Sequence, residues 1–231
     1  MTLLQFKMIT ETPIEQYRYD TFWTKEPETN EWIRSFDDKC VFFDVGANIG
    51  VYSLYCAYVH PESKILAFEP HKPNFFRLLD NIRLNGIKNI ESFRYCVGDK
   101  TGHMDFCGVS DEIGSTGGQM MDTCEIGEVA CWSLDDFIIH GFYSPNPNHI
   151  KIDIDGQEQK VVRGMTQTLK SSLLRSVLIE VEPQNRDEIV WIFLENDFTM
   201  DNKFNKMKHH SRTRRKREGI NVENIIFTRN I

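Results

Sequence analysis

Two short stretches of this chain carry the residue types that hold a nucleoside at the edge of a sheet. An apolar run leads into residues 44–50, which have glycines at positions 46 and 50, and a second apolar run ends in the acid Glu69. In an open α/β sheet, a glycine turn lets the backbone approach a ligand, and a carboxylate after the next strand accepts hydrogen bonds from ribose hydroxyls. We therefore expect both stretches to face one ligand.

The glycine spacing narrows the kind of nucleoside. It is Gly-x-x-x-Gly, and Asn48 stands where a dinucleotide site places its second glycine. The pattern favours a nucleoside without a diphosphate, of which S-adenosylmethionine (SAM) is the common one. Asp44 would reach the amino acid part of SAM directly or through water, Gly46, Asn48 and Gly50 would form the turn around it, and Glu69 would hold the ribose. A tight strand-to-helix turn without a ligand is the alternative.

The end of a third predicted strand adds two candidate contacts to the cofactor, Val97 and Asp99. Val97 could cover one face of an adenine ring, and Asp99 could accept a hydrogen bond from its exocyclic amine. Asp99 could equally do no more than cap the turn that follows, because Asp is a common turn residue. Both interpretations stay open at this point.

A cluster of charged residues occurs in two further apolar runs. Strand periodicity places Lys151 and Asp153 on one side of their strand, and Glu180 lies on the adjacent predicted strand with the same alternation. A lysine and an aspartate buried in the centre of a sheet are costly unless they are paired or functional. We expect Lys151, Asp153 and Glu180 to form an acceptor site, and a structural ion pair is the alternative.

The hydrophobic pattern alternates between strand and helix, which predicts a Rossmann-like, doubly wound α/β sheet, mostly parallel, with an antiparallel C-terminal hairpin strand. Residues 1–39 are expected to form a helical segment of one or two helices that packs on the domain 40–231, giving a single domain overall. The predicted strands are 40–45, 64–68, 90–97, 103–109, 128–134, 149–154, 176–181, 198–204 and 224–229, with 90–97 and 103–109 forming a hairpin. The predicted helices are 50–59, 74–85, 156–172 and 186–196, and 110–127 is expected to be irregular.

The composition is that of a folded globule, with 40% apolar and 12% aromatic residues. The six cysteines form no C-x-x-C pair, so buried reduced thiols are expected and neither a disulfide framework nor a zinc site. No apolar run reaches the roughly 20 residues of a membrane span, and no signal peptide is visible. We expect a soluble, cytoplasmic protein.

The net charge of −7 hides one basic run. Residues 203–217 contain eight Lys or Arg and no acid, so the rest of the chain sums to −15 (−7 minus 8). Such a run can attract phosphates or anionic glycans, and it can also be a solvated loop.

Taken together, these motifs resemble the FkbM family of SAM-dependent methyltransferases over nearly the whole chain. The matching segments are 26–29, 44–50, 67–70, 81–86, 97–99, 114–116, 133–136 and 151–156. One position departs from the family pattern, because Asp155 stands where the family usually has Glu. The basic run lies outside the shared pattern.

The resemblance implies a class I methyltransferase fold and O-methylation, frequently of a sugar hydroxyl in a glycan or a secondary metabolite. The sulfonium methyl is already electrophilic, so such an enzyme mainly aligns the acceptor oxygen. We expect Asp153 to act as the base, with Lys151 and Glu180 orienting it. A divalent ion, Mg²⁺ or Mn²⁺, held by Asp153, Asp155 and Glu180 or Glu182 could instead lower the pKa of the hydroxyl.

Two other functions compete with glycan methylation. The charged cluster and the basic run are also compatible with methylation of the 2′-hydroxyl of RNA ribose. The chain has no recognisable RNA-binding module and its body is acidic, so we do not expect nucleic acid as a partner. A non-catalytic SAM-binding domain is the third possibility, and the intact cluster of acids argues against it.

Overall fold

A seven-stranded sheet organises the part of the chain that the computed structural model describes, which is residues 6–107, 110–121, 128–140, 145–205 and 222–229. Its order is β10-β11-β9-β8-β1-β2-β3, and β11 runs antiparallel to both neighbours while the other pairs are parallel. The predicted sheet is therefore confirmed. The strands are β1 Val41–Val45, β2 Lys64–Phe68, β3 Ile90–Phe93, β8 His149–Ile152, β9 Ser176–Val181, β10 Phe198–Met200 and β11 Glu223–Arg229.

The central strands are apolar because both faces of the sheet are covered. Phe43 and Val45 of β1 and Ile150 and Ile152 of β8 are fully buried in one core cluster, and Phe42 is buried in a second cluster. Parallel strands that are covered on both sides show such continuous apolar runs. A charged side chain between these residues therefore needs a partner.

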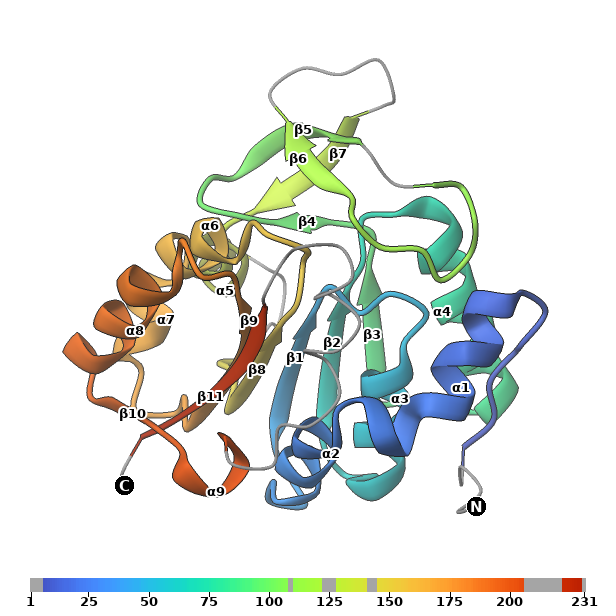
Figure 1. Ribbon diagram of the computed structural model, residues 1–231, viewed down its shortest axis with the longest axis horizontal. Helices are drawn as coiled ribbons and strands as arrows, with labels where there is room; N and C mark the ends of the chain where they lie inside the picture. Colours follow the sequence, from blue (N-terminus) through green and yellow to red (C-terminus); the bar gives the residue numbers. More distant parts are fainter. Residues whose placement is uncertain (1–5, 108–109, 122–127, 141–144, 206–221, 230–231) are drawn as a thin grey trace.

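Helices cover the two faces of the sheet, as Figure 1 shows, with α1 to α4 on one side and α5 to α8 on the other. Most of them lie where the apolar periodicity predicts them. The helices are α1 Pro13–Lys25, α2 Pro27–Arg34, α3 Val51–Val59, α4 Lys72–Asn85, α5 Leu134–His140, α6 Glu158–Arg163, α7 Thr166–Lys170, α8 Arg186–Glu195 and α9 Asn202–Asn205.

Polar contacts within helix α1 and with helix α4 hold α1 in place. It begins with a capping box, in which the Thr12 side chain accepts from the Glu15 N–H and the Glu15 carboxylate accepts from the Thr12 N–H. Glu15 is buried and its Oε1 also lies 3.0 Å from Nε of Arg77 on α4. The N-terminal helix is thereby held against the helix that follows β2.

A second, four-stranded sheet lies across the end of the first, above β1 and β2 in Figure 1. Its order is β4-β7-β5-β6, with β4 Cys96–Val97, β5 Gly102–Cys107, β6 Gln119–Met121 and β7 Glu128–Trp132. Two predictions were wrong here. The chain of 90–97 leaves the main sheet after Phe93, so β3 and β4 belong to different sheets, and β5 pairs with β6 and β7 instead of forming a hairpin with 90–97.

Two other predicted elements do not extend over their full predicted length. The helix predicted over 156–172 is split into α6 and α7 at Gly164, where a Cβ would collide with the carbonyl oxygen of Gly98. The strand predicted over 198–204 ends at Met200, because the Asp201 carboxylate accepts from the N–H groups of Lys203 and Phe204 and starts α9.

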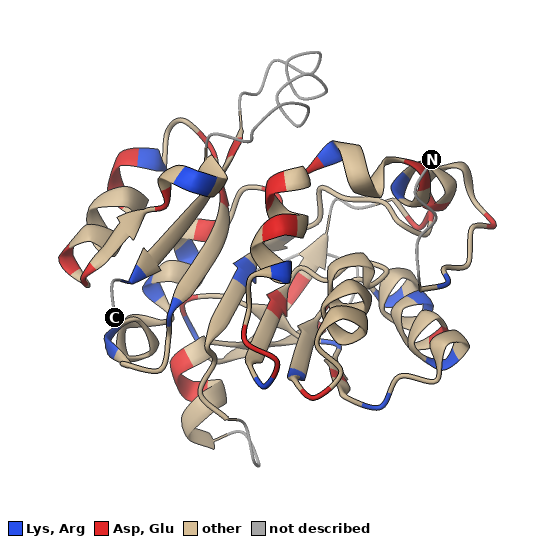
Figure 2. Ribbon diagram, turned by 90° about the horizontal axis from the view of Figure 1, so that it is seen from below, with Lys and Arg blue, Asp and Glu red and all other residues tan. Residues whose placement is uncertain are grey.

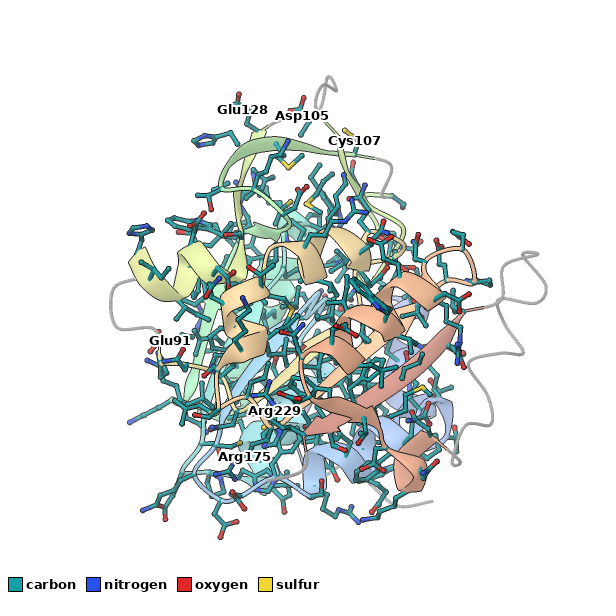
Figure 3. The ribbon with its side chains drawn as sticks, turned by 90° about the vertical axis from the view of Figure 1, so that its left-hand side faces the viewer. Glu91, Asp105, Cys107, Glu128, Arg175 and Arg229 are labelled. Carbon is teal, nitrogen blue, oxygen red and sulfur yellow. The ribbon has the colours of Figure 1, made fainter. Side chains whose placement is uncertain are left out.

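The cysteines follow the prediction with one exception. Cys40, Cys56, Cys96 and Cys131 are buried free thiols. Cys107 at the end of β5 is disulfide-bonded, so the expectation of reduced thiols was wrong there (Figure 3). The core of the small sheet has few buried apolar side chains, and a cross-link restrains the chain where packing contributes little. Cys124 lies outside the described residues.

Figure 2 shows basic and acidic residues interspersed over the helices of the described chain. The basic run, for which the sequence left both an anion site and a solvated loop open, lies from residue 206 onward outside that part of the chain. Among the helices within the described ranges, none is long and apolar enough to cross a bilayer.

Arg229 binds main-chain carbonyl groups at the end of the main sheet that lies away from the small sheet. Arg229, labelled in Figure 3, donates from Nη2 to the carbonyl oxygen of Asn196 at 2.9 Å and also contacts the carbonyl oxygens of Leu169 and Ser171. These carbonyls lie at the C-terminal ends of α7 and α8, where a positive charge is favourable. Arg229 therefore stabilises the fold by joining the ends of α7 and α8 to β11.

Candidate active site

The turn after β1 requires its glycines for two different reasons. Gly46 has a φ of +82°, and a Cβ there would collide with the carbonyl oxygen of Asp153, which follows β8. Gly50 has a φ of +90°, and a Cβ there would collide with Leu78 of α4. Gly46 thus lets the ends of β1 and β8 approach each other, whereas Gly50 lets α4 pack on the turn.

Glu69 joins this turn to the end of β2. Its Oε2 accepts from the backbone N–H of Asn48 at 2.7 Å, and its Oε1 accepts from the backbone N–H of His71 at 2.9 Å. Asn48 has a φ of +53°, which Asn tolerates better than most residues. Burial raises the pKa of Glu69 to about 7, and the two N–H donors limit that rise. The acid and the glycine turn are therefore one structural unit.

One cavity lies over this unit and is lined by half of the predicted site residues, whereas Glu180 is among those that do not line it. Its empty space is about 650 Å³ when the open solvent at its mouth is included. The lining comes from four places in the chain, which are the turn after β1 (Gly46, Ala47, Asn48), the turn after β2 (Glu69, Pro70, His71), the loop before β6 (Ser115, Thr116, Gly118) and the end of β8 (Lys151, Asp153, Ile154, Asp155). Arg18, Val51, Tyr52, Asn74 and Phe106 complete it.

A smaller apolar hollow adjoins this cavity. Val97 lines it together with Phe68, Tyr95 and Met120, and it shares residues such as Pro70 with the larger cavity. A flat apolar ring suits such a lining better than a charged group does. Asp99 lines neither of the two spaces, so its predicted contact with the exocyclic amine stays a prediction without support from this geometry.

The loop before β6, residues 114–118, lines one side of the cavity, and we call it the roof. Side chains from other elements hold it in place. The Ser115 carbonyl accepts from the side-chain amides of Asn48 at 2.9 Å and Asn74 at 3.1 Å. Arg18 of α1 donates to the Gly114 carbonyl, with 2.7 Å from Nη2. The Asp155 carboxylate accepts from the Gly117 N–H at 2.9 Å. The irregular segment predicted over 110–127 thus includes both this roof and β6.

Lys151 and Asp153 lie on the same side of the sheet, as strand periodicity predicts, and they form an ion pair. Nζ of Lys151 lies 2.8 Å from Oδ2 of Asp153, and Lys151 is only 1% exposed. Burial opposes its charge, but the carboxylates of Asp153, Asp44 and Glu26 together raise the pKa of Lys151, so the ammonium stays charged. Nζ also lies 5.0 Å from the centre of the Tyr52 ring, a cation–π distance.

Sequence reasoning missed the network behind this pair. The hydroxyl of Tyr52 donates to Oε2 of Glu26 at 2.7 Å, and Oε1 of Glu26 lies 2.9 Å from Nζ of Lys25. Burial and the Glu26 carboxylate raise the pKa of Tyr52 well above its ordinary value, so the phenol keeps its proton. Glu26 does belong to the matching segment 26–29. An acid at the start of a helix is, however, already explained by its attraction to the positive end of the helix dipole.

Three carboxylates lie close enough to hold a metal ion. Oxygen atoms of Asp153, Asp155 and Glu180 are all within 4.8 Å of one another. The register of β8 and β9 explains this, because Ile152 pairs with Ile179, and Asp153 and Glu180 are the next residues of each strand. Glu182 is not part of this group in the described structure. Carboxylate oxygens suit Mg²⁺ or Mn²⁺.

Asp44 occupies a different place from the other candidates. It is fully buried beside Lys151 in the register of β1 and β8, and its Oδ2 accepts from the Ser53 hydroxyl at 2.6 Å. Burial raises the pKa of Asp44. It lines neither the cavity nor the apolar hollow, so a direct contact with a cofactor is not supported by this geometry. Its part in binding SAM, and that of Gly50, stay predictions.

A doubly wound sheet of this order, with a glycine turn after β1 and an acid after β2 facing one cavity, is a class I methyltransferase fold, as the sequence predicts. The model of the methyltransferase FkbM domain matches residues 44–214, and the chain belongs to that family. This confirms the resemblance drawn from the motifs.

Two curated relatives are similar over part of the chain. The hexuronic acid methyltransferase AglP of Haloferax volcanii is 30% identical over 142 residues, which cover 61% of this chain and 55% of AglP. Methyltransferase 1 of Beauveria bassiana is 26% identical over 156 residues, which cover 58% of this chain and 61% of that protein. The alignments thus span little more than half the length of these relatives.

Two solved structures share the fold. The FkbM methyltransferase from Methylobacillus flagellatus KT superposes with a TM-score of 0.57 at 15% identity, covering 93% of this chain and 52% of that one. The precorrin-6y C5,15-methyltransferase from Geobacter metallireducens GS-15 gives 0.50 at 11% identity, covering 98% and 95%. At these identities the likeness concerns the fold.

Proposed function

We propose that this chain is a SAM-dependent O-methyltransferase whose acceptor is a sugar hydroxyl in a glycan or a glycosylated metabolite. The observation that carries the proposal is one cavity that contains both Glu69 and the Lys151–Asp153 pair, because transfer needs a nucleoside site and an acceptor site in contact. The name of AglP, a hexuronic acid methyltransferase, supports a sugar as the acceptor.

The residues present fit SAM. Glu69 offers a fixed carboxylate for the ribose hydroxyls, the hollow beside Val97 offers apolar cover for the base, and Gly46 and Asn48 form a turn without a diphosphate-binding pattern. When bound, SAM supplies an electrophilic methyl group. The N-terminal helices 13–34 belong to the same unit, because Arg18 and Glu26 reach the cavity or its lining.

The protein's own part in the transfer is to position the acceptor oxygen and remove its proton. Asp153 accepts the proton, Lys151 fixes the carboxylate at 2.8 Å, and Glu180 on β9 orients the same group. The neighbouring ammonium weakens Asp153 as a base, so the proton leaves late, when the new bond has already made the oxygen acidic. A divalent ion is the alternative device, and Asp153, Asp155 and Glu180 would hold it and lower the pKa of the hydroxyl.

The proposal is tested with the purified chain and SAM labelled in its methyl group. The acceptors are hexuronic acid-containing glycans, deoxysugar-rich glycans and short RNAs, each with Mg²⁺, with Mn²⁺ or with a chelator. We expect label in a glycan. Label found only in RNA and lost at high salt would contradict the sugar acceptor, and SAM binding with no transfer to any acceptor would favour a non-catalytic domain.

A further inference from the structure

His71 is a buried polar side chain at the wall of the cavity. It is 6% exposed, lines the cavity, and neither Nδ1 nor Nε2 has a hydrogen-bond partner among the described residues. Buried polar side chains are normally paired, so an orphaned imidazole at a cavity wall indicates a group that arrives with a ligand.

The local structure offers His71 only one polar side chain nearby, among the described residues. His71 is the N-cap residue of α4, but its side chain makes no capping hydrogen bond. The amide of Asn74, one turn further on, is the nearest polar side chain and opposes the fall in the pKa of His71, but no hydrogen bond of acceptable geometry joins the two side chains. Oδ1 of Asn74 accepts from the Gly114 N–H at 2.7 Å and Nδ2 donates to the Ser115 carbonyl. The imidazole is therefore left for the cavity.

The position of His71 selects the part of the nucleoside that it would meet. It lines the polar cavity with Glu69 and does not line the apolar hollow beside Val97. Its own backbone N–H donates to the Glu69 carboxylate, so the two side chains leave the same tight turn. The base fits the hollow, whereas the ribose belongs beside Glu69 and His71.

The chemistry of the two side chains is complementary. In its ionised form, which prevails above pH 7, Glu69 can only accept, so it takes the hydrogens of the ribose hydroxyls and leaves their oxygens without a donor. Burial lowers the pKa of His71, so its imidazole is neutral near pH 7 and has one N–H to donate. We propose that His71 positions the cofactor by donating to one of the two ribose hydroxyls that Glu69 binds, and that it selects ribose over deoxyribose there. This inference rests on the proposed function.

The test measures binding of S-adenosylhomocysteine (SAH) and of its 2′-deoxy and 3′-deoxy analogues by calorimetry. The proteins are the unmodified chain, His71→Phe, His71→Asn and the control His103→Phe, which makes the same change at an exposed position on β5. A net hydrogen bond of about 0.5–1.5 kcal/mol predicts that His71→Phe binds SAH roughly 2- to 12-fold more weakly.

The analogues separate a direct contact from a structural effect. One of the two analogues lacks the hydroxyl that His71 would bind. For that analogue, the loss of affinity relative to SAH should be smaller in His71→Phe than in the unmodified chain, by the same roughly 2- to 12-fold factor. The control His103→Phe should behave like the unmodified chain. Equal losses in both proteins would overturn the inference, as would unchanged SAH binding by His71→Phe. If His71→Phe does not fold, His71→Asn gives the same comparison. Folded, unmodified chain that binds no SAH would overturn the proposed function itself.

Discussion

The backbone N–H of Asn48 donates to the carboxylate of Glu69 at 2.7 Å, while the side-chain amide of Asn48 donates to the Ser115 carbonyl at 2.9 Å. One residue therefore connects the glycine turn after β1, the acid after β2 and the roof of the cavity. Because Glu69 is held at both oxygens, its position in the cavity is set before any ligand arrives. Preorganisation of this kind lowers the entropy cost of binding.

Replacing Glu69 by Ala should weaken SAM binding strongly, because a buried carboxylate that accepts from ribose hydroxyls is lost. Hydrogen bonds to charged groups are worth about 1.5–3 kcal/mol, which corresponds to roughly 10- to 100-fold in Kd. Calorimetry with SAM and SAH measures this. Glu62→Ala changes an exposed acid on the surface and should leave Kd unchanged. An unaltered Kd in Glu69→Ala would show that the nucleoside binds elsewhere.

Replacing Asp153 by Asn should mainly lower turnover. The amide keeps the shape of the side chain but cannot take a proton, so kcat should fall by roughly 10²- to 10⁴-fold. The Kd for SAH should change much less. Steady-state kinetics with the acceptor found in the labelling experiment, together with SAH binding, measures both. A large loss of SAH affinity with normal kcat would mean that the cofactor and acceptor sides have been exchanged.

Substituting the two positive-φ glycines Gly46 and Gly86 by Ala should give very different losses of stability. Gly46→Ala adds a Cβ that meets the Asp153 carbonyl, so the free energy of unfolding should fall by roughly 3 kcal/mol or more. Gly86 ends α4 at a φ of +63° with open space around it, and Gly86→Ala should cost about 1 kcal/mol. Urea unfolding of both variants compares them, and equal losses would contradict the close approach at Gly46.

The contribution of Glu158 to the stability of the ligand-free protein should fall as the pH rises from about 4.5 to about 7. Burial raises the pKa of Glu158 to about 7 from its ordinary 4.5, so the folded state binds this proton more tightly than the unfolded chain. The resulting stabilisation is complete below pH 4.5 and is lost as the pH passes about 7, a change of roughly 3 kcal/mol. Denaturant titrations from pH 4 to pH 8 measure it.

Glu158→Gln removes this proton exchange, so between pH 4.5 and pH 7 its free energy of unfolding should change relative to the unmodified chain by the amount that Glu158 contributes. Glu188→Gln, at an exposed position of α8, is the matched control and should keep the slope. A profile with the same slope in Glu158→Gln as in the unmodified chain would assign the pH dependence to other groups.

Features that depend on local apolar pattern could be predicted from the sequence. The strands 64–68 and 176–181 have the predicted bounds, because continuous apolar runs between turns are typical of buried parallel strands. The pairing of Glu69 with the glycine turn was also predictable, since the order of the sheet brings the ends of β1 and β2 together. The Lys151–Asp153 pair follows from strand periodicity in the same way.

Features that depend on distant partners could not be predicted. The small sheet contains strands of two and three residues, which carry too little pattern to be assigned without their neighbours. Arg18 and Asn74 lie on helices whose sequences indicate only helix formation, and their role appears when both meet the roof. His71 follows the predicted Glu69 by two residues, but a lone histidine at a helix start has no distinctive signal.

The contacts that fasten the roof use main-chain atoms of Gly114, Ser115 and Gly117. A change of the Thr116 side chain would leave these contacts in place, whereas Gly114 and Gly117 have positive φ values and a Cβ at Gly118 would collide with Phe106. Thr116 lines the cavity while its neighbours carry the attachments, which makes it an adjustable position in an otherwise clamped segment. An effort to redirect the proposed methyl transfer to a different acceptor would begin with a library at Thr116.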